Sequence, residues 1–159
     1  MRIAIVNEEG IVTNIIDAPM IYADNQKLCY DWTQLREPYT DIEPVEHAKL
    51  RHISAAKAYR DAQEVAAITY NGNDYDYDAK ARERLNIARQ ALEDLGTESI
   101  DWTTADNTDV TLTIDDFAAI NILAATRSND LHVAYRATKA KLEAATTIEE
   151  LEQIYPLKG

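Results

Sequence analysis

The chain has 159 residues, 46% of them hydrophobic, which is enough for one domain with a core, or for one domain with a small appendage. Its 28 acidic and 16 basic residues give a net charge of −12, which repels phosphate backbones and argues against nucleic-acid binding. A single cysteine, Cys29, excludes an intrachain disulfide. The apolar run at residues 1–6 is too short for a signal peptide or a membrane span, so we expect no membrane partner and synthesis in a cytoplasm.

Residues 1–43 have the pattern of a β-hairpin followed by a loop-rich segment. Two strand-like runs, residues 2–6 and 11–16, flank a turn in which Gly10 can adopt a positive φ. Beyond this hairpin, prolines interrupt any long helix, and only short stretches such as residues 28–32 can pair as strands. Because an isolated two-stranded hairpin is marginal in water, we predict that residues 1–43 dock on another surface.

Residues 44–159 are predicted to form a second, α+β module of long helices packed with two short antiparallel hairpins. The predicted helices cover residues 44–67, 79–95, 114–145 and 148–155. One predicted hairpin pairs residues 68–70 with 75–77 around Asn71-Gly72, and the other pairs residues 99–104 with 109–113. Asp78 and Thr147 stand at helix N-cap positions, the latter in a capping box with Glu150. The fold class is therefore α+β, with an N-terminal β-hairpin appendage.

The predicted helix at residues 114–145 would be about 45–50 Å long, which exceeds the diameter of a compact small domain. Half of its heptad positions are polar or small: Ile114, Phe117, Asn121, Ala124, Ser128, Leu131, Tyr135, Thr138, Leu142 and Ala145. This composition favours packing against the helix at residues 44–67 over self-association, and it leaves a homo-oligomer open. The predicted packing stripe of that first helix contains Val45, Ala48, His52, Ala55, Tyr59, Ala62 and Ala66.

Metal-ligand patterns are weak in this chain. The histidines His47, His52 and His132 lie in no H-E-x-x-H or Cys/His spacing, and the first two are five residues apart, on different faces of a helix. The Asp-Tyr alternation at residues 74–78 resembles the opening of a calcium loop, but the glycine and the bidentate glutamate of that loop are missing. Strand alternation, with Asp78 as a helix cap, explains this segment better.

Catalytic chemistry has little support in the sequence. The motif G-x-S-x-G is absent, and the four glycines, at positions 10, 72, 96 and 159, form neither a G-x-G-x-x-G nor a Walker loop. We therefore predict a non-enzymatic protein with no catalytic residue, no cofactor and no metal site. Carboxylates alone leave one enzymatic alternative open, a glycan- or wall-degrading enzyme.

Protein–protein binding is the remaining signal, because tyrosine and tryptophan are enriched in interfaces and the chain has nine tyrosines and two tryptophans. The apolar residues of the N-terminal segment and of the long helix are the candidates for this role. The predicted partner-binding residues are Ile3, Ile5, Ile11, Ile15, Trp32, Tyr39, Leu131 and Tyr135.

A family resemblance is carried by four stretches in order, at residues 55–62, 69–78, 101–112 and 144–151. The most specific is Trp102-Thr103-Thr104-Ala105-Asp106-Asn107, followed by Val110-Thr111-Leu112. Together they resemble domain-of-unknown-function family 4376 over residues 50–155, a family found in bacteriophage and prophage tail-fibre and tail-assembly proteins. The resemblance implies a structural component of a phage tail, made in the host cytoplasm and located in the virion tail, with fibre, baseplate or tail-tube proteins as partners. The alternative that it leaves open is a tail-fibre assembly chaperone that does not stay in the virion.

Overall fold

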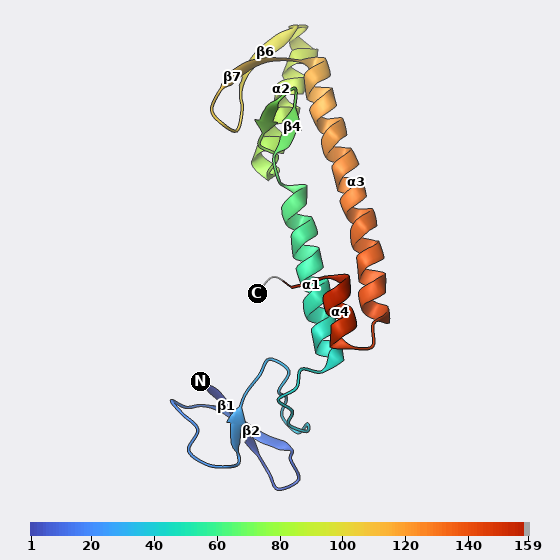
Figure 1. Cartoon of the computed structure of the whole chain (residues 1–159). Helices are drawn as coiled ribbons and strands as arrows, with labels where there is room; N and C mark the ends of the chain where they lie inside the picture. The colour runs from blue at the N-terminus through green and yellow to red at the C-terminus, as the bar shows by residue number, and fades with distance from the viewer. Residues whose placement is uncertain (158–159) are drawn as a thin grey trace. The chain divides into compact units, whose positions relative to one another are not determined.

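The structure is a computed structural model, and it describes residues 1–157. The strands and helices follow one another along the chain (Figure 1) as β1 (Arg2–Val6), β2 (Val12–Asp17), β3 (Gln26–Leu28), α1 (Val45–Glu64), β4 (Ile68–Tyr70), β5 (Asn73–Tyr75), α2 (Ala79–Leu95), β6 (Ser99–Thr103), β7 (Asp109–Thr113), α3 (Ile114–Ala144) and α4 (Ile148–Ile154). The predicted α+β class, with its N-terminal hairpin, long helices and two further hairpins, is confirmed.

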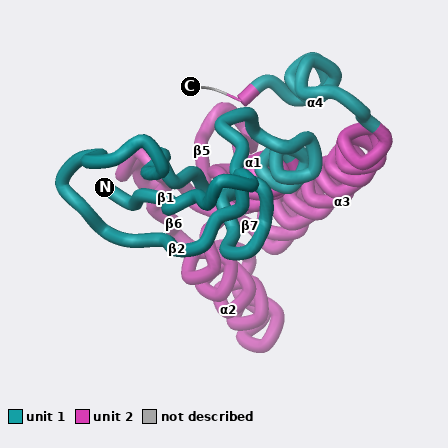
Figure 2. The backbone as a smooth tube through the Cα atoms, turned by 90° about the horizontal axis from the view of Figure 1, so that it is seen from below, with its two compact units in different colours: residues 1–52, 145–156 teal, residues 53–144, 157–159 magenta. Residues whose placement is uncertain are grey.

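The chain divides into two compact units, coloured separately in Figure 2. Unit 1 contains residues 1–52 and 145–156, and unit 2 contains residues 53–144 together with the last residues of the chain. Unit 1 therefore takes in more than the segment predicted at residues 1–43, since the first turns of α1 and all of α4 belong to it.

The strands of unit 1 form a three-stranded antiparallel sheet in the order β2-β1-β3. Its hairpin turn is stabilised by Asn7, whose Oδ1 accepts from the N–H groups of Glu9 (3.1 Å) and Ile11 (2.8 Å). Gly10 has a φ of 79°, as the turn prediction requires. The sequence named only short stretches such as residues 28–32 as able to pair, and the third strand lies slightly earlier, at Gln26–Leu28. The ladder of β1 ends at Arg2, whose carbonyl oxygen accepts the N–H of Cys29.

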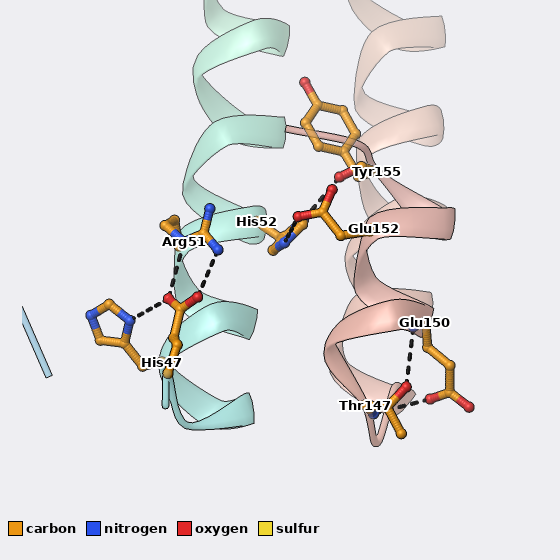
Figure 3. A network of polar contacts seen from close by, with 8 residues as sticks. His47, Arg51, His52, Thr147, Glu150, Glu152 and Tyr155 are labelled. Atoms are coloured by element: carbon orange, nitrogen blue, oxygen red, sulfur yellow. Dashed lines mark hydrogen bonds and ion pairs between the residues drawn. The ribbon is translucent and has the colours of Figure 1, made fainter. Parts of the chain in front are cut away.

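Helix α4 begins at the predicted capping box. The Thr147 hydroxyl accepts the Glu150 N–H at 3.2 Å, and the Glu150 carboxylate in turn accepts the N–H of Thr147 at 3.3 Å (Figure 3). The other end of α4 is tied to α1 by His52, a fully buried side chain whose Nδ1 lies 2.9 Å from the Tyr155 carbonyl oxygen. A carbonyl only accepts, so His52 Nδ1 bears the proton. His52 is thus a buried histidine that holds two segments of unit 1 together.

The first hairpin of unit 2 turns at Asn71-Gly72, with φ values of 48° and 78°, as in a type I′ turn. Strand β5 begins directly after it, so Tyr70 pairs with Asn73, and the predicted start at Tyr75 is two residues too late. The turn has two residues, whereas we predicted a four-residue connection. Strand β5 therefore begins two residues earlier than predicted. Asp78 caps α2 as predicted, accepting the Ala81 N–H at 2.8 Å.

The core of unit 2 lies between α2, α3 and the two hairpins. Its buried residues are Ile68, Tyr75, Leu85, Ala88, Leu92, Leu112, Phe117, Ile120 and Ala124. Trp102 of β6 packs against this core, with its ring 5.5 Å from that of Phe117 in an edge-to-face contact. The start of α3 is fixed by Asp116, which accepts the Thr113 N–H at 2.8 Å and the Tyr70 hydroxyl at 2.8 Å. These two hairpins and α3 therefore share one hydrogen-bonded junction.

The predicted packing of α3 against α1 within one chain is confirmed inside unit 2. Glu64 Oε1 lies 2.8 Å from His132 Nε2, and the Arg60 guanidinium lies 4.7 Å from the centre of the Tyr135 ring. Arg127 closes the C-terminal end of α1 by donating to the carbonyl oxygens of Glu64, Ala66 and Ala67 at 2.9–3.0 Å.

The predicted packing stripe of α1 is wrong in its second half. Ala56 is buried there, while Tyr59 is 56% exposed. The residues of α1 that meet α3 in unit 2, Arg60 and Glu64, continue from Ala56 in steps of four. Because the helix has 3.6 residues per turn, successive residues in four-residue steps rotate around its axis. This row therefore lies on a different face from the row with alternating three- and four-residue steps that the sequence predicted.

Candidate partner-binding surface

The N-terminal part of unit 1 exposes more large apolar side chains than it buries. Its buried residues are Ile3, Ala4, Val6 and Val12. Its exposed large apolar residues are Met1, Met20, Ile21, Tyr22, Leu28, Leu35 and Ile42. A sheet with so small a core gains little from burial in the isolated chain, and its exposed large apolar residues are candidates for contact with a partner.

Three of these residues are consecutive in the connection between β2 and β3. Met20, Ile21 and Tyr22 are 55%, 43% and 66% exposed. The connection is held at both ends: the Ala18 carbonyl oxygen accepts the amino group of residue 1 at 2.8 Å, and the Tyr22 N–H donates to Gln26 Oε1 at 2.8 Å. We name these three residues the 20–22 patch; its apolar side chains project from a loop whose ends are fixed by hydrogen bonds.

An aromatic group lies farther along the same unit. The rings of Tyr30 and Trp32 are stacked, with centroids 4.7 Å apart and planes 3° from parallel, and the Trp32 ring meets His47 of α1 edge-on at 5.4 Å. The Trp32 indole N–H donates to the Thr40 carbonyl oxygen at 3.1 Å. Burial raises the pKa of the nearby Tyr39 hydroxyl, with smaller contributions from Tyr30 and other neighbours. Because Trp32 contacts α1 in this way, it packs inside unit 1 and is only partly accessible.

Glu43 links this aromatic group to α1 electrostatically. Its carboxylate accepts from Arg51 through Nε (3.1 Å) and Nη2 (2.8 Å), and its Oε1 lies 2.7 Å from His47 Nδ1. Figure 3 shows His47 and Arg51 one turn apart on α1. The hydrogen bonds from Arg51, and then that from His47, lower the pKa of the Glu43 carboxyl. The charged form of Glu43 is thus favoured in the folded chain.

This lowered pKa predicts an acid-sensitive contact. A group whose pKa is lower in the folded state stabilises the fold above its ordinary pKa, here 4.5, and that stabilisation is lost as the pH falls through the folded value. We expect the NMR signal of the Trp32 indole N–H to shift and broaden as the pH falls below 4.5, when its neighbour His47 loses the charged Glu43 carboxylate. In Glu43→Gln this acid transition should be absent. The exposed neighbour Glu46, in Glu46→Gln, is the matched control and should leave the transition in place, so equal behaviour of the two variants would contradict the assignment.

The structure distributes the predicted partner-binding residues over both units. In unit 1, Ile3 is fully buried in the sheet, so it is a core residue; the partly buried ones are Ile5, Ile11, Ile15, Trp32 and Tyr39. In unit 2, Tyr135 lies against Arg60, and Leu131 lines an open hollow on α3. The 20–22 patch was missed, although three consecutive large apolar residues after Pro19, in a segment predicted to be loop, were a usable signal.

Residues 1–157 offer neither a metal site nor a membrane-spanning helix. Residues 1–157 contain no group of three or more His, Cys, Asp or Glu side chains placed to hold a metal ion. At the predicted Asp-Tyr alternation, Tyr75 is buried in the core and the Asp78 carboxylate is bound to a helix N-terminus. None of the helices in residues 1–157 combines the length and the apolar character needed to cross a membrane.

The fold is that of a two-unit α+β protein. Its most distinctive accessible feature is the set of exposed apolar side chains in the N-terminal part of unit 1. Residues 47–155 match the family model described as Domain of unknown function (DUF4376). The match covers more than half of the chain, and the chain therefore belongs to this family. No curated protein and no solved structure matches it.

Proposed function

We propose that this protein is a non-enzymatic structural component of a bacteriophage tail, associated with the fibre or the baseplate, and that it acts by binding another tail protein. The observation that supports the proposal most directly is the apolar exposure of the first 44 residues, above all the 20–22 patch. The tail setting comes from the family resemblance. The surface supplies the mode of action, which is burial of apolar side chains against a partner.

The sheet of unit 1 offers a backbone edge beside these exposed residues. Strand β1 is central, and the outer edge of β2 is partly covered, since Val12 exchanges backbone hydrogen bonds with Arg36 and Glu37. The outer edge of β3 pairs with no other strand in residues 1–157. An extended partner segment added there would gain backbone hydrogen bonds and would cover Leu28, which is 45% exposed. We therefore place the partner at β3 and the adjoining loop.

The test is incorporation into particles. Phage particles assembled with the wild-type chain and purified should contain it in a stoichiometric amount by quantitative mass spectrometry. Ile21→Asp with Tyr22→Ser should reduce that amount strongly, because loss of a central apolar contact costs about 2 kcal/mol or more, roughly thirtyfold in affinity. Leu95→Asp, at a site in unit 2 that is 78% exposed, is the matched control and should incorporate normally.

Absence of the wild-type chain from purified particles, together with its presence in fibre-assembly intermediates, would contradict the structural role and favour the assembly chaperone. Equal incorporation of the patch variant and the control would show that the 20–22 patch is not the binding surface.

A further inference from the structure

Helix α3 has a second apolar face besides the one that packs in unit 2. Its inner face contains Phe117, Ile120, Ala124 and Leu142, all buried. On the opposite side, at alternating four- and three-residue steps, a row runs from Ala119 to Ala144. We name this row, with Ile122 at its side, the outer stripe; its members are Ala119, Ile122, Leu123, Thr126, Asp130, Val133, Ala137, Ala140 and Ala144.

The outer stripe has the composition of an interface and not that of a solvated face. Ile122, Leu123 and Val133 are 66%, 43% and 49% exposed, and Asp130 is the one charged residue in the stripe. The solvent side of a surface helix is ordinarily charged or polar, and a helix that is apolar on both sides is one that is covered on both sides. Small residues at the remaining positions let a second helix approach closely.

The surface beside the stripe is hollowed to receive side chains. An open hollow of about 490 Å³ lies along α3, and its lining is mostly apolar. Its lining residues are Leu123, Thr126, Arg127, Asp130, Leu131 and Ala134. Three residues of the outer stripe, Leu123, Thr126 and Asp130, thus form one wall of a groove of the kind that accepts a side chain from a facing helix.

The charge along α3 indicates which helix faces it. Residues 114–130 contain three aspartates and one arginine, a formal charge of −2, whereas residues 131–144 contain Arg136, Lys139 and Lys141 against Glu143, a formal charge of +2. A second α3 running in the opposite direction would keep the two basic halves apart, because over the paired residues 119–144 each basic half would face a half whose only charges, Arg127 and Asp130, cancel. A parallel α3 would set like halves together and bring Arg136 beside Lys141 of the other copy.

We propose that the occupant of the outer stripe is a second copy of this chain, and that two α3 helices pair antiparallel along it. The register that covers the whole stripe places Ala119 opposite Ala144, and so Thr126 opposite Ala137. In this arrangement Asp130 is the one carboxylate within the contact, where it weakens the pair. This inference is independent of the 20–22 patch and of the tail setting.

The first experiment measures mass in solution. Sedimentation equilibrium of the full chain should give twice its 17.9 kDa at high concentration. Val133→Glu and Ile122→Glu should each weaken the dimer by about thirtyfold or more, as expected for a charge placed in an apolar contact. At concentrations where the wild-type chain is also monomeric, their melting curves should equal that of the wild type, because both sites are exposed in the monomer. Asp130→Ala should strengthen the dimer. Ile87→Glu, at a site on α2 that is 60% exposed, is the matched control and should not change it.

The second experiment tests direction. In a Cys29→Ser background, Thr126→Cys and Ala137→Cys proteins should form a disulfide when mixed and oxidised, and neither should form one with itself. A chain that stays monomeric at every concentration, or equal weakening by Val133→Glu and Ile87→Glu, overturns the proposal. A disulfide between two Thr126→Cys chains overturns the antiparallel arrangement. Only in a parallel pair does each residue along the contact lie opposite the same residue of the other copy.

Discussion

Phe117→Ala is expected to destabilise unit 2 by about 3–5 kcal/mol, the largest effect that we predict for a single substitution in this chain. The Phe117 side chain is fully buried in the core, and it forms the inner surface on which Trp102 packs. Truncation to alanine removes the transfer free energy of the ring and leaves a cavity that the surrounding helix α3 and strand β7 cannot close. The free energy of unfolding is measured by urea denaturation followed by circular dichroism.

The matched control for this prediction is Phe117→Leu, which keeps most of the buried volume and should cost clearly less, about 1–1.5 kcal/mol. A second control is Ile87→Ala, at a site on α2 that is 60% exposed and lies outside the outer stripe, which should leave the free energy of unfolding nearly unchanged. A cost for Phe117→Ala below that of Phe117→Leu would contradict its position in the core.

Trp102→Ala is the second large prediction, with an expected cost of about 2–3 kcal/mol. A fully buried indole would cost about 3–5 kcal/mol on truncation to alanine. The structure lowers this value, because Trp102 is partly exposed: the centre of its ring lies 5.5 Å from that of Phe117, and the Arg84 guanidinium lies 5.1 Å from the centre of the Trp102 ring. The same urea denaturation, recorded by circular dichroism, measures the loss.

A double-mutant cycle separates the contact between the two rings from their individual burial. The coupling between Trp102→Ala and Phe117→Ala should be about 0.5–1.5 kcal/mol, the range for an edge-to-face aromatic pair. Arg84→Ala is the control for the exposed face of the indole and should cost less than about 1 kcal/mol. Strict additivity of the two aromatic substitutions would show that the rings do not interact.

Helix starts and turns were predictable because each depends on a few neighbouring residues. Asp78 and Thr147 cap α2 and α4 as predicted, and the Asn71-Gly72 turn has the positive φ values that its residues favour. The same holds for the β6–β7 hairpin, whose pairing of Trp102 with Val110 follows from the predicted strands. In each case the hydrogen-bond partner or the required dihedral angle lies within ten residues of the residue that determines it.

Three features of the structure were predicted wrongly or missed, because they depend on residues that are distant in the chain. The position of β3 is determined by pairing with β1, more than twenty residues earlier. The buried row of α1 in unit 2 is determined by α3, through pairs such as Glu64 with His132. The exposure of the 20–22 patch depends on how little core the sheet can form, which no local pattern reports.

The α+β class, the order and nearly all of the bounds of the helices, the capping residues and the family resemblance could be predicted from the sequence, since helix periodicity and caps are local properties of the chain. Which apolar residues are left uncovered depends on the tertiary structure. Ile3, a predicted contact residue, is buried, whereas Met20, Ile21 and Tyr22 are exposed, and α3 has an outer stripe as well as an inner face. The physical reason is that burial is a property of the packed chain: an apolar residue has the same sequence signal whether it faces a core or a partner.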